Sequence, residues 1–128
     1  LDRNPGRSLS DLKSELGQAW TSLTMSPHCD DETKYSVVDR VVADYQALGK
    51  AGGSILGRKI VEVNTVNGVR VTLEDGSWVL VRASSNKPEL VTVVESMQGE
   101  DDMRALFRTE VKPRLTKFPE VGAYNQEI

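Results

Sequence analysis

The segment from Ile60 to Glu95 alternates apolar and polar residues with a period of two, and two tight-turn signals interrupt it. The dipeptide Asn67-Gly68 between alternating segments is the strongest short-range signal for a β-hairpin, and Asp75-Gly76 predicts a second turn. Residues 77–83 are apolar on both faces, which predicts a strand in the middle of the sheet. The sequence therefore predicts four strands joined as an antiparallel meander. They cover residues 60–65, 69–74, 77–83 and 90–95.

Helical spacing flanks this region on both sides. After Pro27, apolar residues recur at steps of three and four, and Asp30 and Asp31 stand where a helix dipole favours negative charge. The expected buried positions of this helix are Tyr35, Val38, Val41, Val42, Tyr45 and Leu48. A last helix is expected to start in solvent at residues 100–102 and to be stopped or kinked at Pro113. Its apolar face contains Met103, Leu106, Phe107 and Val111.

The first 27 residues carry weaker signals. They predict a short helix that ends at Leu16 and a weak strand at Trp20–Ser26. Taken together, the elements predict an α+β fold of two layers, with a four-stranded antiparallel sheet packed against helices. We divide the chain into an N-terminal connecting segment, residues 1–27, and one domain, residues 28–128.

The composition excludes several classes of protein. With 128 residues the chain has the size of one domain, and 38% hydrophobic residues with a net charge of −3 do not fit a disordered chain. The acidic balance argues against a nucleic-acid-binding domain, and no apolar run is long enough to cross a membrane. The single cysteine, Cys29, fits a reducing compartment, so we expect a cytoplasmic protein. Because the chain starts at Leu1 rather than Met, we expect a C-terminal piece of a longer protein, with processing of a complete small protein as the alternative.

The loop after the predicted central strand concentrates groups that bind anions. Arg82 ends the strand and offers a rigid fork of donors that matches two oxygens of a phosphate or carboxylate. Ser84 and Ser85 add hydroxyl groups, Asn86 adds an amide, and Lys87 adds a positive charge. Successive backbone N–H groups in a tight turn also form an anion-binding concavity. The alternative is an ordinary β-turn with Arg82 paired to a nearby acid, because such residues dominate turns for reasons unrelated to ligands.

The run from His28 to Glu32 contains five potential metal ligands in succession. Adjacent residues rarely converge on one ion, and none of the standard spacings of cysteine and histidine ligands is present. The acidic residues in this run are better explained as the start of a helix. We therefore predict no metal site and assign no catalytic residue in this chain.

The anion loop resembles a specific family of enzymes. Residues 82–90, Arg-Ala-Ser-Ser-Asn-Lys-Pro-Glu-Leu, followed by Val93-Val94-Glu95, resemble the C-terminal phosphate-binding loop of the α-D-phosphohexomutases, the phosphoglucomutase/phosphomannomutase enzymes. Ser85 and Asn86 occupy the places of the family's usual Asn or Gly and Thr, so the pattern is altered but remains small and polar. Four other segments fall in the order of that family's last domain, so the resemblance covers most of the chain. They are residues 8–12, 31–35, 67–69 and 74–82.

This resemblance implies a fold and a set of ligands. The fourth domain of these enzymes has a fold related to the TATA-binding protein, a curved antiparallel sheet backed by helices. By position, the phosphate ligands would be Arg82, Ser84, Ser85 and Asn86, with Lys87 as a possible extra contact. The resemblance also implies that the domain holds the substrate phosphate that is not being transferred and closes the active site.

The same resemblance implies partners and chemistry outside this chain. The complete enzymes interconvert hexose 1-phosphates and 6-phosphates through a phosphoserine and a bound Mg²⁺, and the nucleophile, metal and sugar segments of the family are missing here. We expect a phosphosugar substrate and the N-terminal domains of the same chain as partners, no nucleic acid or membrane, no cofactor in this domain, and no activity of the domain alone. The alternative is a stand-alone, non-enzymatic module of the same fold that binds an anion or a protein.

Overall fold

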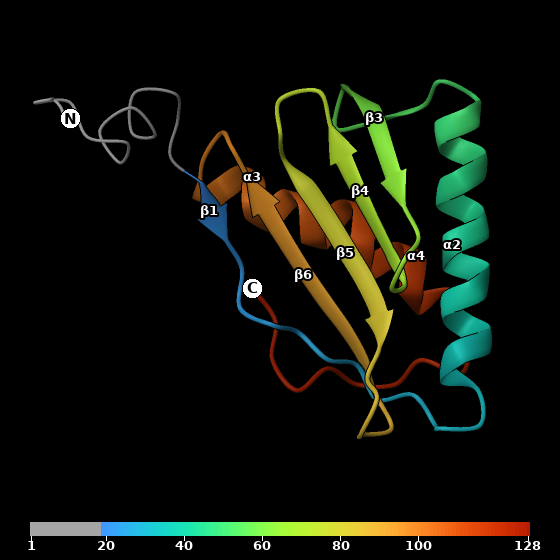
Figure 1. The fold of residues 1–128 in the computed structure, drawn as a ribbon. Coiled ribbons are helices and arrows are strands. Elements are labelled where there is room, and N and C mark those ends of the chain that lie inside the picture. Colours follow the sequence, from blue (N-terminus) through green and yellow to red (C-terminus); the bar gives the residue numbers. More distant parts are fainter. Residues whose placement is uncertain (1–18) are drawn as a thin grey trace, which may run out of the picture.

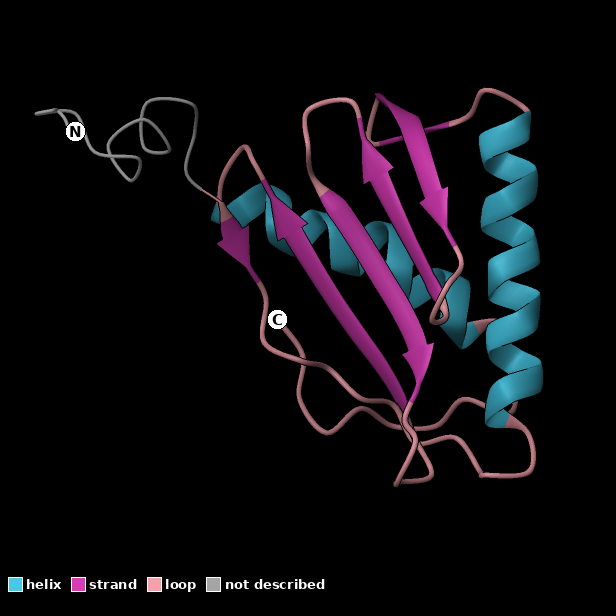
Figure 2. Ribbon diagram, viewed as in Figure 1, coloured by secondary structure: helices cyan, strands magenta, loops and turns pink. Residues whose placement is uncertain are grey.

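The computed structural model describes residues 19–128, which form one antiparallel sheet with helices packed against it (Figure 1 and Figure 2). The strands lie in the order β1-β6-β5-β4-β3-β2. The elements are β1 (Trp20–Thr21), α2 (Lys34–Lys50), β2 (Ser54–Ile55), β3 (Arg58–Asn64), β4 (Val69–Leu73), β5 (Trp78–Ala83), β6 (Leu90–Ser96), α3 (Glu100–Ala105), the π-helical turn η1 (Leu106–Val111) and α4 (Lys112–Thr116). No helix among these residues combines the length and the apolar character needed to cross a bilayer.

The α+β class and the antiparallel meander are confirmed, but the predicted number of four strands is wrong. The sheet has six strands, because β1 and β2 extend its two edges. Each of these strands has only two residues, too few to show a period of two in the sequence. They are recognised as strands only because they pair with β6 and β3. The predicted weak strand, Trp20–Ser26, is shortened to β1, and in the rest of that range Met25 makes an isolated bridge to Thr92. The relation to the TATA-binding protein and the domain division at residue 27 stay predictions, and the short helix ending at Leu16 lies outside the described residues.

A β-bulge at Val61 divides β3 into two halves. Ile60 pairs with Leu73 but Glu62 pairs with Thr72, so Val61 has no partner on β4. An extra residue reverses which alternate positions point inward. Ile60 is buried before the bulge, whereas Val61 lies exposed and Val63 packs against the core after it. The hydrophobic pattern of this strand alone therefore does not show which face is buried.

The long helix α2 covers β3, β4 and β5 (Figure 1). It begins at Lys34, one turn later than the predicted start at Asp30, because residues 31–33 form a turn. The prediction that Tyr35 is buried is wrong, since 58% of this residue is exposed. Val37, which the prediction omitted, is fully buried on the same face as Val41.

The last helical segment continues through Pro113, where a stop or a kink was predicted. Residues 106–111 form a π-helical turn between α3 and α4, and the helix ends only at Thr116. Proline lacks an N–H group and its ring clashes with the carbonyl four residues earlier in a regular α-helix. A π-turn displaces that carbonyl, which explains how the segment accommodates the proline. The predicted apolar face is confirmed, because Met103, Leu106, Phe107 and Val111 are all buried.

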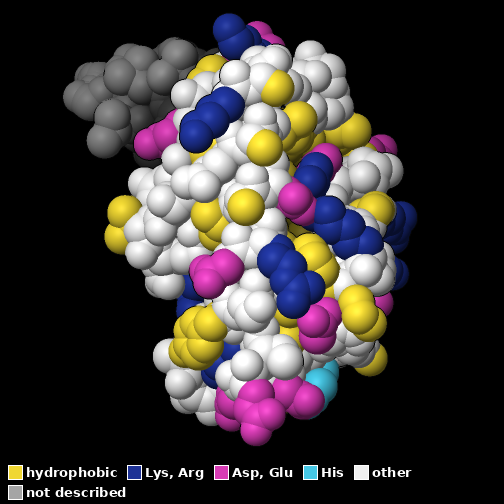
Figure 3. Space-filling view, turned by 90° about the vertical axis from the view of Figure 1, so that its right-hand side faces the viewer, with side chains coloured by type: hydrophobic (Ala, Val, Ile, Leu, Met, Phe, Trp, Pro, Cys, Tyr) yellow, Lys and Arg dark blue, Asp and Glu magenta, His cyan; other side chains and the backbone are white. Residues whose placement is uncertain are grey.

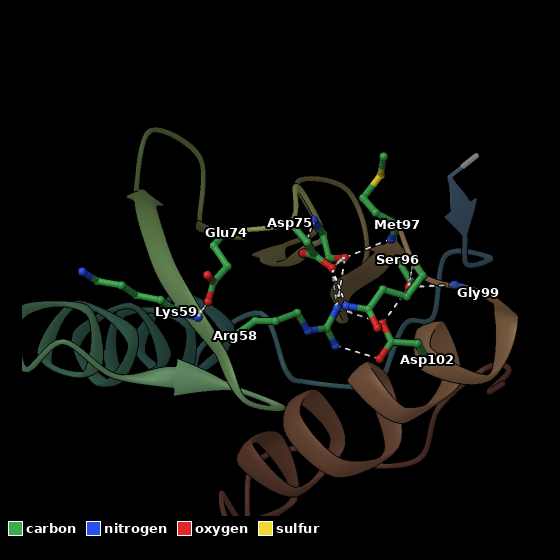
Figure 4. Close-up of polar contacts among 10 residues, drawn as sticks. Arg58, Lys59, Glu74, Asp75, Ser96, Met97, Gly99 and Asp102 are labelled. Atoms are coloured by element: carbon green, nitrogen blue, oxygen red, sulfur yellow. Dashed lines mark hydrogen bonds and ion pairs between the residues drawn. The ribbon is translucent and has the colours of Figure 1, made fainter. Parts of the chain in front are cut away.

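A buried arginine ties α3 to the strands. Arg58 at the start of β3 donates hydrogen bonds to Asp102 in α3 at 2.7 and 3.0 Å and to Asp75 at 2.9 Å (Figure 4). Ser96 donates a further hydrogen bond to Asp102 at 2.6 Å. The prediction of a fully solvated start for the last helix is therefore wrong at Asp102, and this network holds the end of the sheet opposite the anion loop (Figure 1).

Candidate anion-binding site

The anion loop emerges from the middle of the sheet, at the end where α2 begins (Figure 1). The strand β5 pairs with β4 on one side and β6 on the other, and Val79 and Val81 are buried beneath it. Arg82 is the last residue but one of β5 and pairs with Val91. A strand held on both edges and on one face gives the residues at its tip a well-defined position.

The guanidinium group of Arg82 makes no ion pair within residues 19–128. Its nearest polar contact is a long hydrogen bond of 3.5 Å from Nη1 to the carbonyl of Ala83. The turn between β3 and β4 packs directly against its backbone, because a Cβ atom placed on Gly68 would lie 2.6 Å from the Cβ of Arg82. Arg82 is therefore held at its base, while its donors are left for a ligand.

The loop that follows turns tightly around Ser84 and Pro88. The N–H of buried Ser84 donates to the carbonyl of Glu89 at 3.0 Å, and its hydroxyl donates to Oδ1 of Asn86 at 3.1 Å. That contact occupies the acceptor oxygen of the Asn86 amide and leaves its NH₂ donors available. Within the described part of the chain, the backbone N–H groups of residues 85–87 have no acceptor.

The five predicted ligands thus lie at the tip of β5 and on the turn that follows it. Arg82 is half-buried and Ser84 is buried, whereas Ser85, Asn86 and Lys87 are exposed. Unpaired N–H groups beside cationic side chains are the donors that bind phosphate or another anion. The arrangement can bind an oxyanion through charge-assisted hydrogen bonds, and it offers no nucleophile activated by a neighbouring base.

Acidic residues surround the loop. Asp30, Asp31 and Glu32 are exposed just before α2, and acidic side chains gather at that end of the molecule (Figure 3). Their charges oppose the attraction that Arg82 and Lys87 exert on an anion at long range. An anion at this loop would therefore be held mainly by short hydrogen bonds.

The run of potential metal ligands does not converge. Nε2 of His28 lies 3.0 Å from Oδ1 of Asp30 at the surface, whereas Cys29 is buried with its sulfur 3.7 Å from Oγ1 of Thr33. Burial raises the pKa of the Cys29 thiol, despite the hydrogen bond from Thr33. No three carboxylate, thiol or imidazole groups of residues 19–128 are grouped so that they could hold a metal ion.

Two features beside the loop were missed by the sequence analysis. A groove of about 320 Å³ lies between α2 and the turn after β3, and Ala83 at the base of the loop lines it together with Tyr35, Asp39 and Asn67. Lys34 reaches the loop from the first turn of α2. Neither feature has a signal in the sequence, because each joins residues from separate elements.

The comparison with protein families identifies the domain. Residues 29–112 match the family model described as "Phosphoglucomutase/phosphomannomutase, C-terminal domain", which covers well over half of the chain and includes α2 to η1. The chain belongs to this family. The matched part contains the whole anion loop, at the place where these C-terminal domains were expected to bind phosphate.

Curated relatives carry the names of sugar-phosphate mutases. The probable phosphoglucosamine mutase of Methanothermobacter thermautotrophicus is 33% identical over 92 residues, or 72% of this chain and 18% of the relative. The phosphopentomutase of Thermococcus kodakarensis is 37% identical over 68 residues, or 53% of this chain and 14% of the relative. The probable phosphoglucosamine mutase of Methanopyrus kandleri is 33% identical over 101 residues, or 79% of this chain and 19% of the relative. The chain thus spans less than a fifth of the length of these relatives.

Proposed function

We propose that this chain is the C-terminal domain of a cytoplasmic phosphohexomutase that interconverts hexose 1-phosphates and 6-phosphates. Its task is to bind the phosphate group of the substrate that is not being transferred. The observation that carries this proposal is a set of donors at and after the tip of β5. The guanidinium of Arg82 forms no ion pair with residues 19–128, and the three N–H groups of residues 85–87 have no acceptor among those residues. Membership of the family and the mutase names of the relatives support it.

The geometry suits a phosphate presented from either end of a sugar. Arg82 and Lys87 bind through charge, and the N–H groups of the turn bind through hydrogen bonds, so the recognition addresses the phosphate rather than one face of the sugar. An exposed loop of this kind completes a site only when a second domain brings the substrate to it. Closure then excludes water from the reacting groups.

The remaining catalytic parts are assigned to the domains upstream. In the proposed enzyme those domains would provide a bound Mg²⁺ and a phosphoserine. Residues 19–128 contain no group of three carboxylate, thiol or imidazole side chains that could hold a metal ion. Within the described chain no step is assigned to a metal or to a nucleophile. We infer that the domain alone does not catalyse the mutase reaction.

An amide-shift titration tests the proposal. The ¹⁵N-labelled chain is titrated with inorganic phosphate and with glucose 6-phosphate, and the resonances of residues 82–88 are expected to shift with both. Arg82→Ala removes a charge-assisted hydrogen bond of about 1.5–3 kcal/mol and so weakens phosphate binding about tenfold or more.

The matched control is Arg104→Ala. Arg104 is an exposed arginine of α3 that pairs with Glu100, at the opposite end of the sheet from the anion loop (Figure 1). Its loss removes the same charge and should leave phosphate affinity within twofold. If both variants lost phosphate affinity equally, the loss would follow from the change in net charge and not from the position of Arg82. Absence of shifts in residues 82–88 at millimolar phosphate would contradict the proposal and favour a stand-alone module with another ligand.

A further inference from the structure

Lys34 is a buried lysine at an unfavourable position. It is the first residue of α2, where the helix dipole is positive and disfavours a cation, and only 4% of its side chain is exposed. Burying an ammonium group is costly unless its N–H groups are all used. A lysine placed here needs partners that compensate for both effects.

Its partners are a carboxylate and a loop carbonyl. Nζ of Lys34 donates to Oδ1 of Asp31 at 2.8 Å and to the backbone carbonyl of Lys87 at 3.0 Å. The ring of Tyr35 also lies 5.3 Å from Nζ. The contact with Lys87 joins residues 53 positions apart in the sequence, and it is made to the last of the five predicted ligands of the anion loop.

Backbone hydrogen bonds join the same two segments on either side of this contact. The N–H of Cys29 donates to the carbonyl of Pro88 at 2.9 Å, and the N–H of Leu90 donates to the carbonyl of Pro27 at 2.9 Å. The carbonyl of Lys87 also accepts the N–H of Glu89 at 2.8 Å. The bonds of Pro88 and Leu90 hold the end of the loop. Among the described residues, the only hydrogen bond that reaches residues 85–87 from outside the loop is the one from Lys34.

We propose that Lys34 is a positioning residue for the anion loop, a role that rests on the proposed function. A peptide unit is planar, so holding the carbonyl of Lys87 restricts rotation of the units next to it. The preceding unit carries the N–H group of Lys87, and the next two units along the loop carry those of residues 86 and 85, none of which has an acceptor among the described residues. These groups bind an anion well only if they are ordered beforehand. Lys34 thus acts through the loop and makes no contact with the ligand.

The test compares Lys34→Met with a control that weakens the fold elsewhere. Methionine keeps the length of the buried stem and removes the donor. The control, Val111→Ala, removes buried methyl groups from η1, outside the anion loop. Unfolding in urea measures the loss of stability in each variant, so that phosphate affinity is compared at a known destabilisation.

In Lys34→Met, inorganic phosphate should bind at least fivefold more weakly, and the heteronuclear ¹H–¹⁵N NOE of residues 85–87 should fall before any phosphate is added. Val111→Ala should show neither change. If wild type binds phosphate at the loop and Lys34→Met binds it within twofold of wild type, the positioning role is overturned while the proposed function stands. If wild type itself shows no phosphate shifts in residues 82–88, the proposed function is overturned instead.

A measurement on wild type decides the case in which Lys34→Met does not fold. The buried ammonium of Lys34 gives its own ¹⁵N signal when it exchanges slowly with water. Because its partner carbonyl belongs to the loop, saturating phosphate should shift this signal together with the amides of residues 85–87. Loop amides that shift without any change in the ammonium signal would overturn the positioning role.

Discussion

The buried arginine of β3 offers a sharp test of how the fold is held together. Arg58 is 9% exposed in its side chain and donates to two carboxylates, Asp75 and Asp102, which are each 21% exposed (Figure 4). Arg58→Met keeps an apolar stem of similar length and leaves both carboxylates without their cation. Removing one partner of a buried ion pair costs about 3–5 kcal/mol. Since both carboxylates retain some access to water, we expect the lower end, about 3 kcal/mol.

Urea denaturation followed by tryptophan fluorescence measures this loss. Urea carries no charge and does not screen the ion pairs, unlike guanidinium chloride. With a denaturant slope of about 1.5 kcal/mol/M, a loss of about 3 kcal/mol lowers the midpoint by about 2 M and leaves the slope unchanged. A native domain has a free energy of unfolding of only about 5–15 kcal/mol, so the variant should be marginally stable.

The control for this experiment is again Arg104→Ala. This exposed arginine pairs with Glu100 one turn away in α3, and exposed pairs of this kind contribute about 0.3–0.5 kcal/mol. If Arg58→Met lost less than about 1 kcal/mol, or no more than the control, the network would be solvated in solution. The reasoning from its burial would then be refuted.

Two further predictions concern a turn and the response to acid. Gly68 has a φ of +76°, and a Cβ there would lie 2.3 Å from the carbonyl oxygen of Val81, so Gly68→Ala should cost about 2–4 kcal/mol. Gly52→Ala, with a φ of +72° but no atom within 4 Å of the added Cβ, should cost only about 1 kcal/mol, and equal losses would remove the role of the contact. Burial raises the pKa of Asp75, but hydrogen bonds from the neighbouring backbone and from Arg58 outweigh it and hold the pKa at about 2, below its ordinary 3.8. The stabilisation from Asp75, on the order of 2 kcal/mol, is therefore complete above about pH 4 and is lost as the pH falls through about 2. The urea midpoint of the wild type should fall over this range. The same fall in Asp75→Asn would show that Asp75 is not its cause.

The sequence was informative wherever a structure depends on neighbours in the chain. The strands β3 and β4 follow a period of two, β5 and β6 are short apolar runs, and turn residues separate all four, so each was predictable from a short window. The same applies to the apolar face of the last helical segment. By contrast, β1 and β2 are two residues long and exist only because a neighbouring strand pairs with them.

Two predictions about burial were wrong for related reasons. Tyr35 satisfies the helical spacing but lies outside the buried face of α2, whose buried residues are Lys34, Val37, Val38, Val41 and Tyr45. Asp102 has the sequence of a solvated helix start, yet the fold places it against Arg58, 44 residues away. Spacing within one element does not show what packs against it.

The candidate site also combines features set by neighbours in the chain with features set by tertiary contacts. Arg82 to Lys87 are contiguous, so their chemistry could be identified from residue types alone, and their collection on one turn follows from the strand before them. The sequence by itself thus determined the donors and their order. Only the tertiary structure decided that Arg82 lacks an acidic partner within the described residues and that Lys34 donates a hydrogen bond to the loop carbonyl of Lys87. Neighbouring residues are linked by the covalent chain and keep their relation in any fold, whereas distant residues meet only when the whole core packs.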